Sequence, residues 1–212
     1  GTGLSSEGSF RTLSNPPTSQ ASGLTATVSS ASQIDLSITN AAGFPASGAT
    51  QGGYLLIYST STPTLGSVNG QAPSASSGNI FSTSTTILPS NPATTINVTG
   101  LSSSTSYNFI IIPYTWDGTN SATYNYLVTN AVTVSATTNA GLPTLISPTA
   151  TNITSTSATL GANITSNGGS SLSARGTVFS TISPVSSNNN ALAEGGTSTG
   201  VFTQSRSSLN PQ

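Results

Sequence analysis

The chain has 212 residues, with three basic and four acidic side chains, a formal net charge of −1, and no histidine, lysine or cysteine. Three scattered arginines are too few to neutralise a nucleic-acid backbone, and the usual general bases, nucleophiles and soft metal ligands are missing. The composition therefore argues against nucleic-acid binding, against catalysis, and against a bound metal or cofactor. No apolar stretch approaches the roughly 20 residues of a membrane span, so none is expected in this segment.

Alternation of apolar and polar residues predicts a series of strands in the first two thirds of the chain. In "QIDLSIT", for example, Ile34, Leu36 and Ile38 fall on one face. A long Ser/Thr/Pro/Gly-rich insert at about residues 60–93 interrupts the series, and no segment has a helical period. Short strands separated by turns predict an all-β fold, an antiparallel β-sandwich. The strands are expected at residues 24–29, 33–39, 53–59, 94–101, 106–115 and 131–138.

Residues 141–212 start a second series of strands. Pro143 and Pro148 flank a segment expected to be a linker, because proline cannot easily continue a strand ladder. The final "SSLNPQ" (residues 207–212) corresponds to the turn "GLSSST" that precedes residues 106–115 in the first series. We therefore expect an incomplete second module. Its strands are predicted at residues 158–164, within 168–180, and at 200–205.

The beginning of the chain, "EGSFRTLSNPP", has the form of a last strand, residues 9–13, followed by a proline-bearing linker. We interpret residues 1–15 as the last strand of a preceding module. Residues 16–140 would then be one complete module, and residues 141–212 an incomplete one. In this interpretation the sequence is one stretch of a tandem array of modules, with ends that fall inside modules. Its partners are neighbouring modules of the same or an identical chain.

The stretch "GLSSSTSYNF" (residues 100–109) resembles a fibronectin type III domain, whose penultimate strand follows a Gly-Leu turn and begins with a corner tyrosine. The resemblance implies that the Tyr107 hydroxyl bonds to backbone near Leu101 and that Phe109 and Ile111 point into an immunoglobulin-like core. The tryptophan common in the second strand of that family is absent, so Ile34 or Leu36 would take its volume.

Two further stretches, "GYLLIYSTSTPTLGSVNGQ" and "PYTWDGTNSATYNYL", look like the fibronectin-type modules of large secreted and cell-surface proteins of the Bacteroidota. Many such proteins are exported by the type IX system, and the group includes adhesins, gliding-motility proteins and appendages of secreted enzymes. The resemblance covers about residues 18–139. It implies an extracellular or cell-surface location.

The loop before the last strand of the complete module holds the candidate ligand-binding residues Trp116, Asp117, Tyr124 and Tyr126. Aromatic faces stack on sugars or pack on proteins, so the loop is a candidate site for a surface glycan or protein. The alternative is that Tyr124 and Tyr126 pack over the end of the sandwich. Asp117 and Asn120 could offer oxygens to calcium, but one carboxylate makes a poor site and Asp-Gly is first of all a turn.

Two central strands are apolar on both faces. If Tyr54, Leu56 and Tyr58 face the core with Phe109 and Ile111, then another set faces outward, and monomers seldom leave such a patch open. Either the insert covers it with Ile80, Phe81, Ile87 or Leu88, or it is a candidate interface with another chain. The outward set is Leu55, Ile57, Ile110 and Ile112.

These patterns predict a non-catalytic, extracellular structural repeat that acts as a stalk or fibre building block of an adhesin-like protein. A variant is a surface filament in which a strand of one subunit completes the sandwich of the next. The alternatives are a carbohydrate- or protein-binding module using the loop around Trp116, and a non-catalytic appendage of a secreted enzyme.

Overall fold

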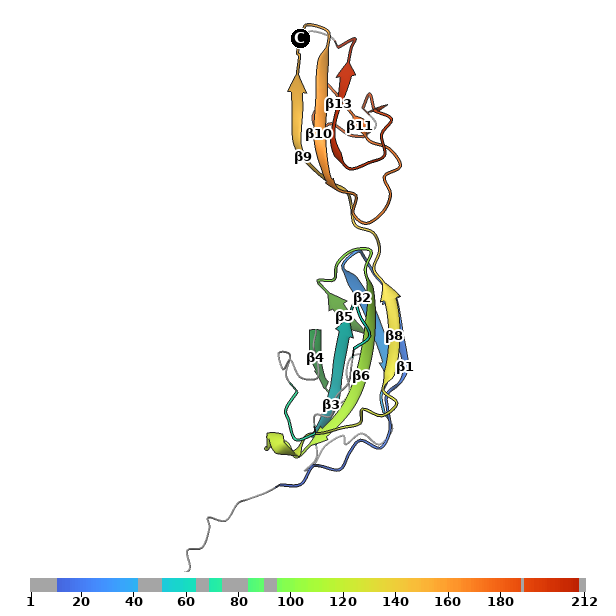
Figure 1. Cartoon of the computed structure of the whole chain (residues 1–212), viewed down its shortest axis with the longest axis vertical. Helices are drawn as coiled ribbons and strands as arrows, with labels where there is room; N and C mark the ends of the chain where they lie inside the picture. Colours follow the sequence, from blue (N-terminus) through green and yellow to red (C-terminus); the bar gives the residue numbers. More distant parts are fainter. Residues whose placement is uncertain are drawn as a thin grey trace, which may run out of the picture. The chain divides into compact units, whose positions relative to one another are not determined.

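The computed structural model describes residues 11–41, 51–63, 69–73, 84–89, 95–187 and 189–209, with the backbone alone for 84–89. The chain is an all-β protein with several antiparallel sheets (Figure 1). It divides into two compact units, unit 1 (Gly1–Thr138) and unit 2 (Asn139–Gln212). In the described ranges the structure has one short 3-10 helix, η1 (Ser121–Thr123), and no helix long and apolar enough to cross a membrane.

Unit 1 contains two antiparallel sheets. One has the strand order β1-β2-β5, and the other has the order β4-β3-β6-β7 with β8 also paired to β6. Six of the strands lie close to the positions that alternation predicts; β4 falls inside the insert, and β7 lies in the segment expected to be a loop. The bounds are β1 (Ser22–Val28), β2 (Gln33–Thr39), β3 (Gln51–Ser59), β4 (Ser84–Pro89), β5 (Ile96–Thr99), β6 (Ser106–Trp116), β7 (Asn125–Tyr126) and β8 (Val132–Thr137).

The two sheets of unit 1 share one apolar core. Ile34 and Leu36 of β2 pack with Leu56 of β3 and with Phe109 and Ile111 of β6, and all five are almost completely buried. Because side chains alternate along a strand, the same register places the odd residues of β3 on the opposite face. The prediction that Phe109 and Ile111 face the core is confirmed.

Tyr107 opens β6 at the edge of this core. Its hydroxyl accepts a hydrogen bond from the Ser102 N–H at 2.9 Å, beside the buried Leu101. The bond expected between the tyrosine hydroxyl and backbone near Leu101 is therefore present. It ties the turn between β5 and β6 to the first residues of β6.

The opposite face of β3 and β6 is also covered. Leu55, Ile57, Ile110 and Ile112 are buried within the chain and pack in a second cluster with three tyrosines of the region after them. Of the insert residues proposed as cover, Ile80 and Phe81 lie outside the described residues, as do the side chains of Ile87 and Leu88. The tyrosines are Tyr114, Tyr124 and Tyr126.

Unit 2 has a three-stranded sheet with the order β13-β10-β9 and a two-stranded ladder of β11 and β12. Its apolar cluster is small: Ala162, Ile164 and Phe202, with Leu172 packed against them. The strand predicted within residues 168–180 is only two residues long. The bounds are β9 (Thr144–Thr151), β10 (Ala158–Ser166), β11 (Gly176–Thr177), β12 (Leu192–Ala193) and β13 (Gly200–Arg206).

The prediction of a linker around Pro148 is wrong, because Thr144–Thr151 forms strand β9. In its pairing with β10, Thr149 lies opposite Gly161 and Ile146 opposite Asn163, so two residues of β9 face one residue of β10. Pro148 lies in this bulge of an edge strand, where its missing N–H breaks no ladder. The preceding Ser147 takes the left-handed conformation, with φ of 50°.

The segment before β1 forms no strand over residues 11–17. The described part of the strand expected at residues 9–13 is therefore a coil, and the rest of it lies outside the described residues. Pro17 is buried, and residues 14 and 15 are hydrogen-bonded to the end of β6 and to the region of η1 and β7.

Candidate functional site

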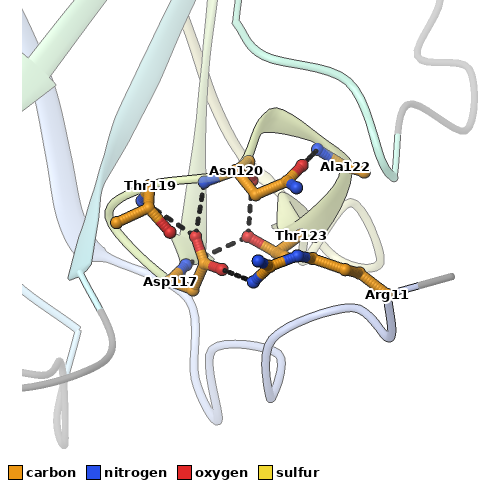
Figure 2. Close-up of polar contacts among 6 residues, drawn as sticks. All are labelled: Arg11, Asp117, Thr119, Asn120, Ala122 and Thr123. Carbon is orange, nitrogen blue, oxygen red and sulfur yellow. Dashed lines mark hydrogen bonds and ion pairs between the residues drawn. The ribbon is translucent and has the colours of Figure 1, made fainter. Parts of the chain in front are cut away.

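The loop between β6 and η1 is organised by the carboxylate of Asp117 (Figure 2). Asp117 Oδ1 accepts the backbone N–H groups of Asn120 at 2.7 Å and of Thr119 at 2.9 Å. These two donors hold the pKa of Asp117 well below its usual range, at about 2. Gly118, with φ of 82°, supplies the left-handed residue that this turn needs. The carboxylate is thus the centre of a turn that folds back on itself.

Asn120 and Thr123 continue the same network. The side-chain oxygen of Asn120 accepts the Ala122 N–H at 2.9 Å and caps η1, and the Thr123 hydroxyl donates to the Asn120 carbonyl at 2.7 Å. The same hydroxyl accepts the Asp117 N–H at 3.0 Å. The oxygens considered for calcium are directed at donors of the loop itself, so the geometry is that of a capped turn. The described residues contain no group of three or more metal-ligating side chains.

Arg11 reaches this loop from the segment before β1. Its Nη1 lies 3.3 Å from Asp117 Oδ2, and the two side chains are 58% and 24% exposed. An ion pair this exposed contributes little stability. The ion pair shows that the segment before β1 lies beside the loop after β6, although the two are far apart in sequence.

Four aromatic rings stack beside the loop. Trp116 lies on Tyr124 with ring centres 4.8 Å apart and planes 11° apart, and Tyr124 is nearly parallel to Tyr126 at 6.1 Å. Tyr114 is tilted against both tyrosines, at 5.4 and 5.5 Å. The three tyrosines are less than 10% exposed, whereas Trp116 is only partly buried. Of this stack, Trp116 therefore presents the most accessible ring to a ligand.

Burial sets the ionisation of these tyrosines. It raises the pKa of Tyr114 to about 12, with the neighbouring Tyr124 adding to the effect. The pKa of Tyr126 and that of Tyr124 are raised for the same first reason, desolvation. All three hydroxyls stay neutral at ordinary pH, so the stack offers neither a general base nor an anion.

Three residues of the insert hold the stack in place. Asn69 Oδ1 accepts the Tyr126 N–H at 2.8 Å, the Gly70 N–H donates to the Tyr124 carbonyl at 2.7 Å, and the Tyr126 hydroxyl donates to the Gln71 carbonyl at 2.9 Å. The sequence-based interpretation missed this contact. The Asn-Gly pair in "SVNGQ" predicts a turn, but nothing in the sequence pairs that turn with Tyr124 and Tyr126.

The structure therefore brings the predicted site residues Trp116, Asp117, Tyr124 and Tyr126 together at one end of unit 1. Most of their polar groups are hydrogen-bonded within unit 1, and most of their apolar surface packs there too. The predicted set lacked Tyr114. It also lacked Arg11 and residues 69–71, whose roles depend on contacts over long separations in sequence.

Unit 2 has a polar centre of its own that the sequence did not indicate. Arg206 is buried, donates to the carbonyl and hydroxyl of Thr177 at 3.0 Å and to the Asn190 carbonyl, and lies over the ring of Phe179. Arg175 donates to Glu194 at 2.7 Å and lies over Phe202. An open pocket of about 280 Å³ on the β11–β12 ladder is lined by Arg175 and Leu192, among others. Since Glu194 neutralises Arg175, this pocket has no free positive charge from that side chain.

Comparisons with known proteins give no assignment: no protein-family model matches the chain, and no curated protein matches it.

Proposed function

We propose that this chain is a non-catalytic structural segment of a large extracellular protein, built of fibronectin type III-like β-sandwich modules in series. Two antiparallel sheets around one core and the bond of Tyr107 to the preceding turn support that sandwich type. The two compact units support a serial arrangement.

One observation carries the functional part of the proposal. The polar groups of the Asp117 loop satisfy one another, and three of its four stacked rings are buried. A catalytic site needs groups that converge on a substrate, whereas here they converge on the loop. Such a loop stabilises the end of a module. In this proposal unit 1 acts as a spacer in a stalk or fibre at the cell surface.

Length is the property that tests a spacer. An in-frame deletion of residues 16–140 from the gene should shorten the surface structure seen by electron cryotomography of whole cells. The control is the double variant Trp116→Ala/Tyr124→Ala, which should leave the length unchanged. A deletion strain with a structure of full length would contradict the proposal.

A binding module is the second candidate, and the partly exposed Trp116 favours it. Its ring lies on Tyr124 and could stack on a sugar or on an apolar protein surface. The double variant Trp116→Ala/Tyr124→Ala would then lose glycan or host-protein binding in an adhesion assay. Unchanged adhesion would exclude this candidate.

A further inference from the structure

The segment that enters unit 1 is fastened to one end of β6. The Thr115 hydroxyl, on β6 and 2% exposed, donates to the Asn15 carbonyl at 2.5 Å. Asn125 of β7, which pairs with Thr115, donates through its side chain to the Ser14 carbonyl at 2.7 Å, and the Ser14 N–H donates to the Thr123 carbonyl at 2.9 Å. We call these contacts the entry pin.

The segment that leaves unit 1 is fastened to the other end of β6. Thr138, 3% exposed, follows β8, and its N–H donates to the Thr105 carbonyl at 3.0 Å. Its hydroxyl donates to the Ser102 carbonyl at 2.6 Å and accepts the Thr105 N–H at 3.0 Å. The same turn is bonded to Tyr107, the second residue of β6. We call these contacts the exit pin.

We propose that unit 1 transmits tension between the two pins through the backbone of β6. The pins lie at the two ends of this one strand, Ser106–Trp116 (Figure 1). β6 is paired along both of its edges, with β3 on one side and β8 and β7 on the other. The inference rests on the proposed function, because tension arises only in a segment that is held at both ends.

The pins protect the strands through which force would otherwise enter. Residues 16–21 connect the entry pin to β1 without forming a ladder of their own, so β1 is strained only after that pin yields. At the other end, Thr138 holds the final residues of β8 against the turn that precedes β6. Strand hydrogen bonds run perpendicular to the strands, so a pull that peels a free end breaks them one after another. A pull along a pinned strand loads several bonds at once.

Single-molecule pulling of the full chain from its two ends tests the proposal. Unit 1 contains nearly twice as much chain as unit 2, so its unfolding is identified by the length released. Thr138→Val removes the hydroxyl of the exit pin with little change in shape. Because it leaves the Ser102 carbonyl and the Thr105 N–H without that buried partner, we expect the unfolding rate of unit 1 at fixed force to rise about tenfold. Thr115→Val should act in the same direction through the entry pin.

Two matched variants serve as controls. Thr137→Val changes an exposed threonine one residue away and should leave the rate within about twofold of the original, as surface substitutions usually do. Thr138→Ser keeps the hydroxyl and should restore most of the resistance. If Thr138→Val behaves like Thr137→Val, the proposal is overturned.

The direction of pulling separates a tension path from a general loss of stability. The chain has no cysteine, so Thr27→Cys on β1 and Thr133→Cys on β8, both exposed, provide handles for a pull across the sheets. Thr138→Val should accelerate unfolding much less in this direction. Equal acceleration in both directions would overturn the proposal. The pulling experiment and the length measurement test different proposals. If the pin variants weaken unit 1 as expected but the deletion leaves the surface structure at full length, only the proposed function is contradicted.

Discussion

Units 1 and 2 are both antiparallel β-structures, but they are held together differently. Unit 1 buries a large apolar cluster between two sheets and a second one on the outer face of β3 and β6. Unit 2 has a small apolar cluster and two arginines that lie over phenylalanine rings. Among the described residues, all but one of the exposed large hydrophobic side chains belong to unit 2, the exception being Leu13. Similar strand patterns can therefore support one unit by apolar packing and another by polar contacts.

The largest expected effect is in the core of unit 1. Phe109→Ala removes a completely buried ring that packs between the two sheets, and it should lower the free energy of unfolding of unit 1 by about 4 kcal/mol. Trp116 is the only tryptophan and lies in unit 1, so its fluorescence during urea unfolding reports on this unit alone. A loss below about 1 kcal/mol would contradict the importance given to this core.

The second effect concerns unit 2. Arg206→Met keeps much of the side-chain length but leaves the carbonyls of Thr177 and Asn190 without their charged donor, so unit 2 should lose about 3 kcal/mol of stability. Hydrogen exchange followed by mass spectrometry resolves unit 2 from unit 1. Arg11→Met is the matched control, because Arg11 is exposed and its ion pair contributes little stability. If Arg206→Met destabilises unit 2 no more than Arg11→Met destabilises unit 1, unit 2 does not depend on its arginine centre.

The same contrast explains how far the sequence could predict the structure. Alternation predicts six strands of unit 1 and both faces of β3 and β6, since burial on a regular strand follows the pleat, but it misses β4 and β7. It fails at β9, where the bulge at Ser147 and Pro148 interrupts the pattern that identifies a strand. The candidate site shows the same limit of local patterns. Trp116 and Asp117 could be predicted as site residues because they stand together in one loop sequence. Their contacts with residues 69–71 and Arg11 depend on chain folding over long separations, which no local pattern records.

A smaller effect is expected at the turn before β6. Tyr107→Phe keeps the ring in the core of unit 1 and removes only the hydroxyl that accepts the Ser102 N–H, so the loss should be about 1 kcal/mol. Urea unfolding followed by Trp116 fluorescence measures it. Tyr58→Phe is the control, because Tyr58 packs against the same core and its ring lies 6.4 Å from that of Tyr107. A loss for Tyr107→Phe no greater than for the control would contradict a stabilising role of this bond.

The smallest effect compares the acid response of the two units. The pKa of Asp117 in the folded chain, about 2, lies below the value of about 3.9 expected when unfolded. The unfolded state therefore binds more protons between these values, and the contribution of Asp117 to stability is present above pH 4 and is lost as the pH falls to 2. Asp117→Asn keeps an acceptor without titrating, so the acid-induced loss in unit 1 should become smaller.

Unit 2 should respond to acid with a different sensitivity to salt. The pKa of Glu194 is lowered first by its hydrogen bonds with Arg175, a cation, whereas that of Asp117 is lowered first by neutral backbone N–H groups. Arg175 and Glu194 are only 12% and 24% exposed, so salt screens their attraction in part. Because Asp117 is held first by neutral groups, 1 M NaCl should still reduce the acid-dependent part of stability more in unit 2 than in unit 1. Urea unfolding at pH 2.5 and pH 5, with hydrogen exchange resolving the units, measures both. The reverse order of salt effects would show that Asp117 depends on its ion pair with Arg11 rather than on the turn it organises.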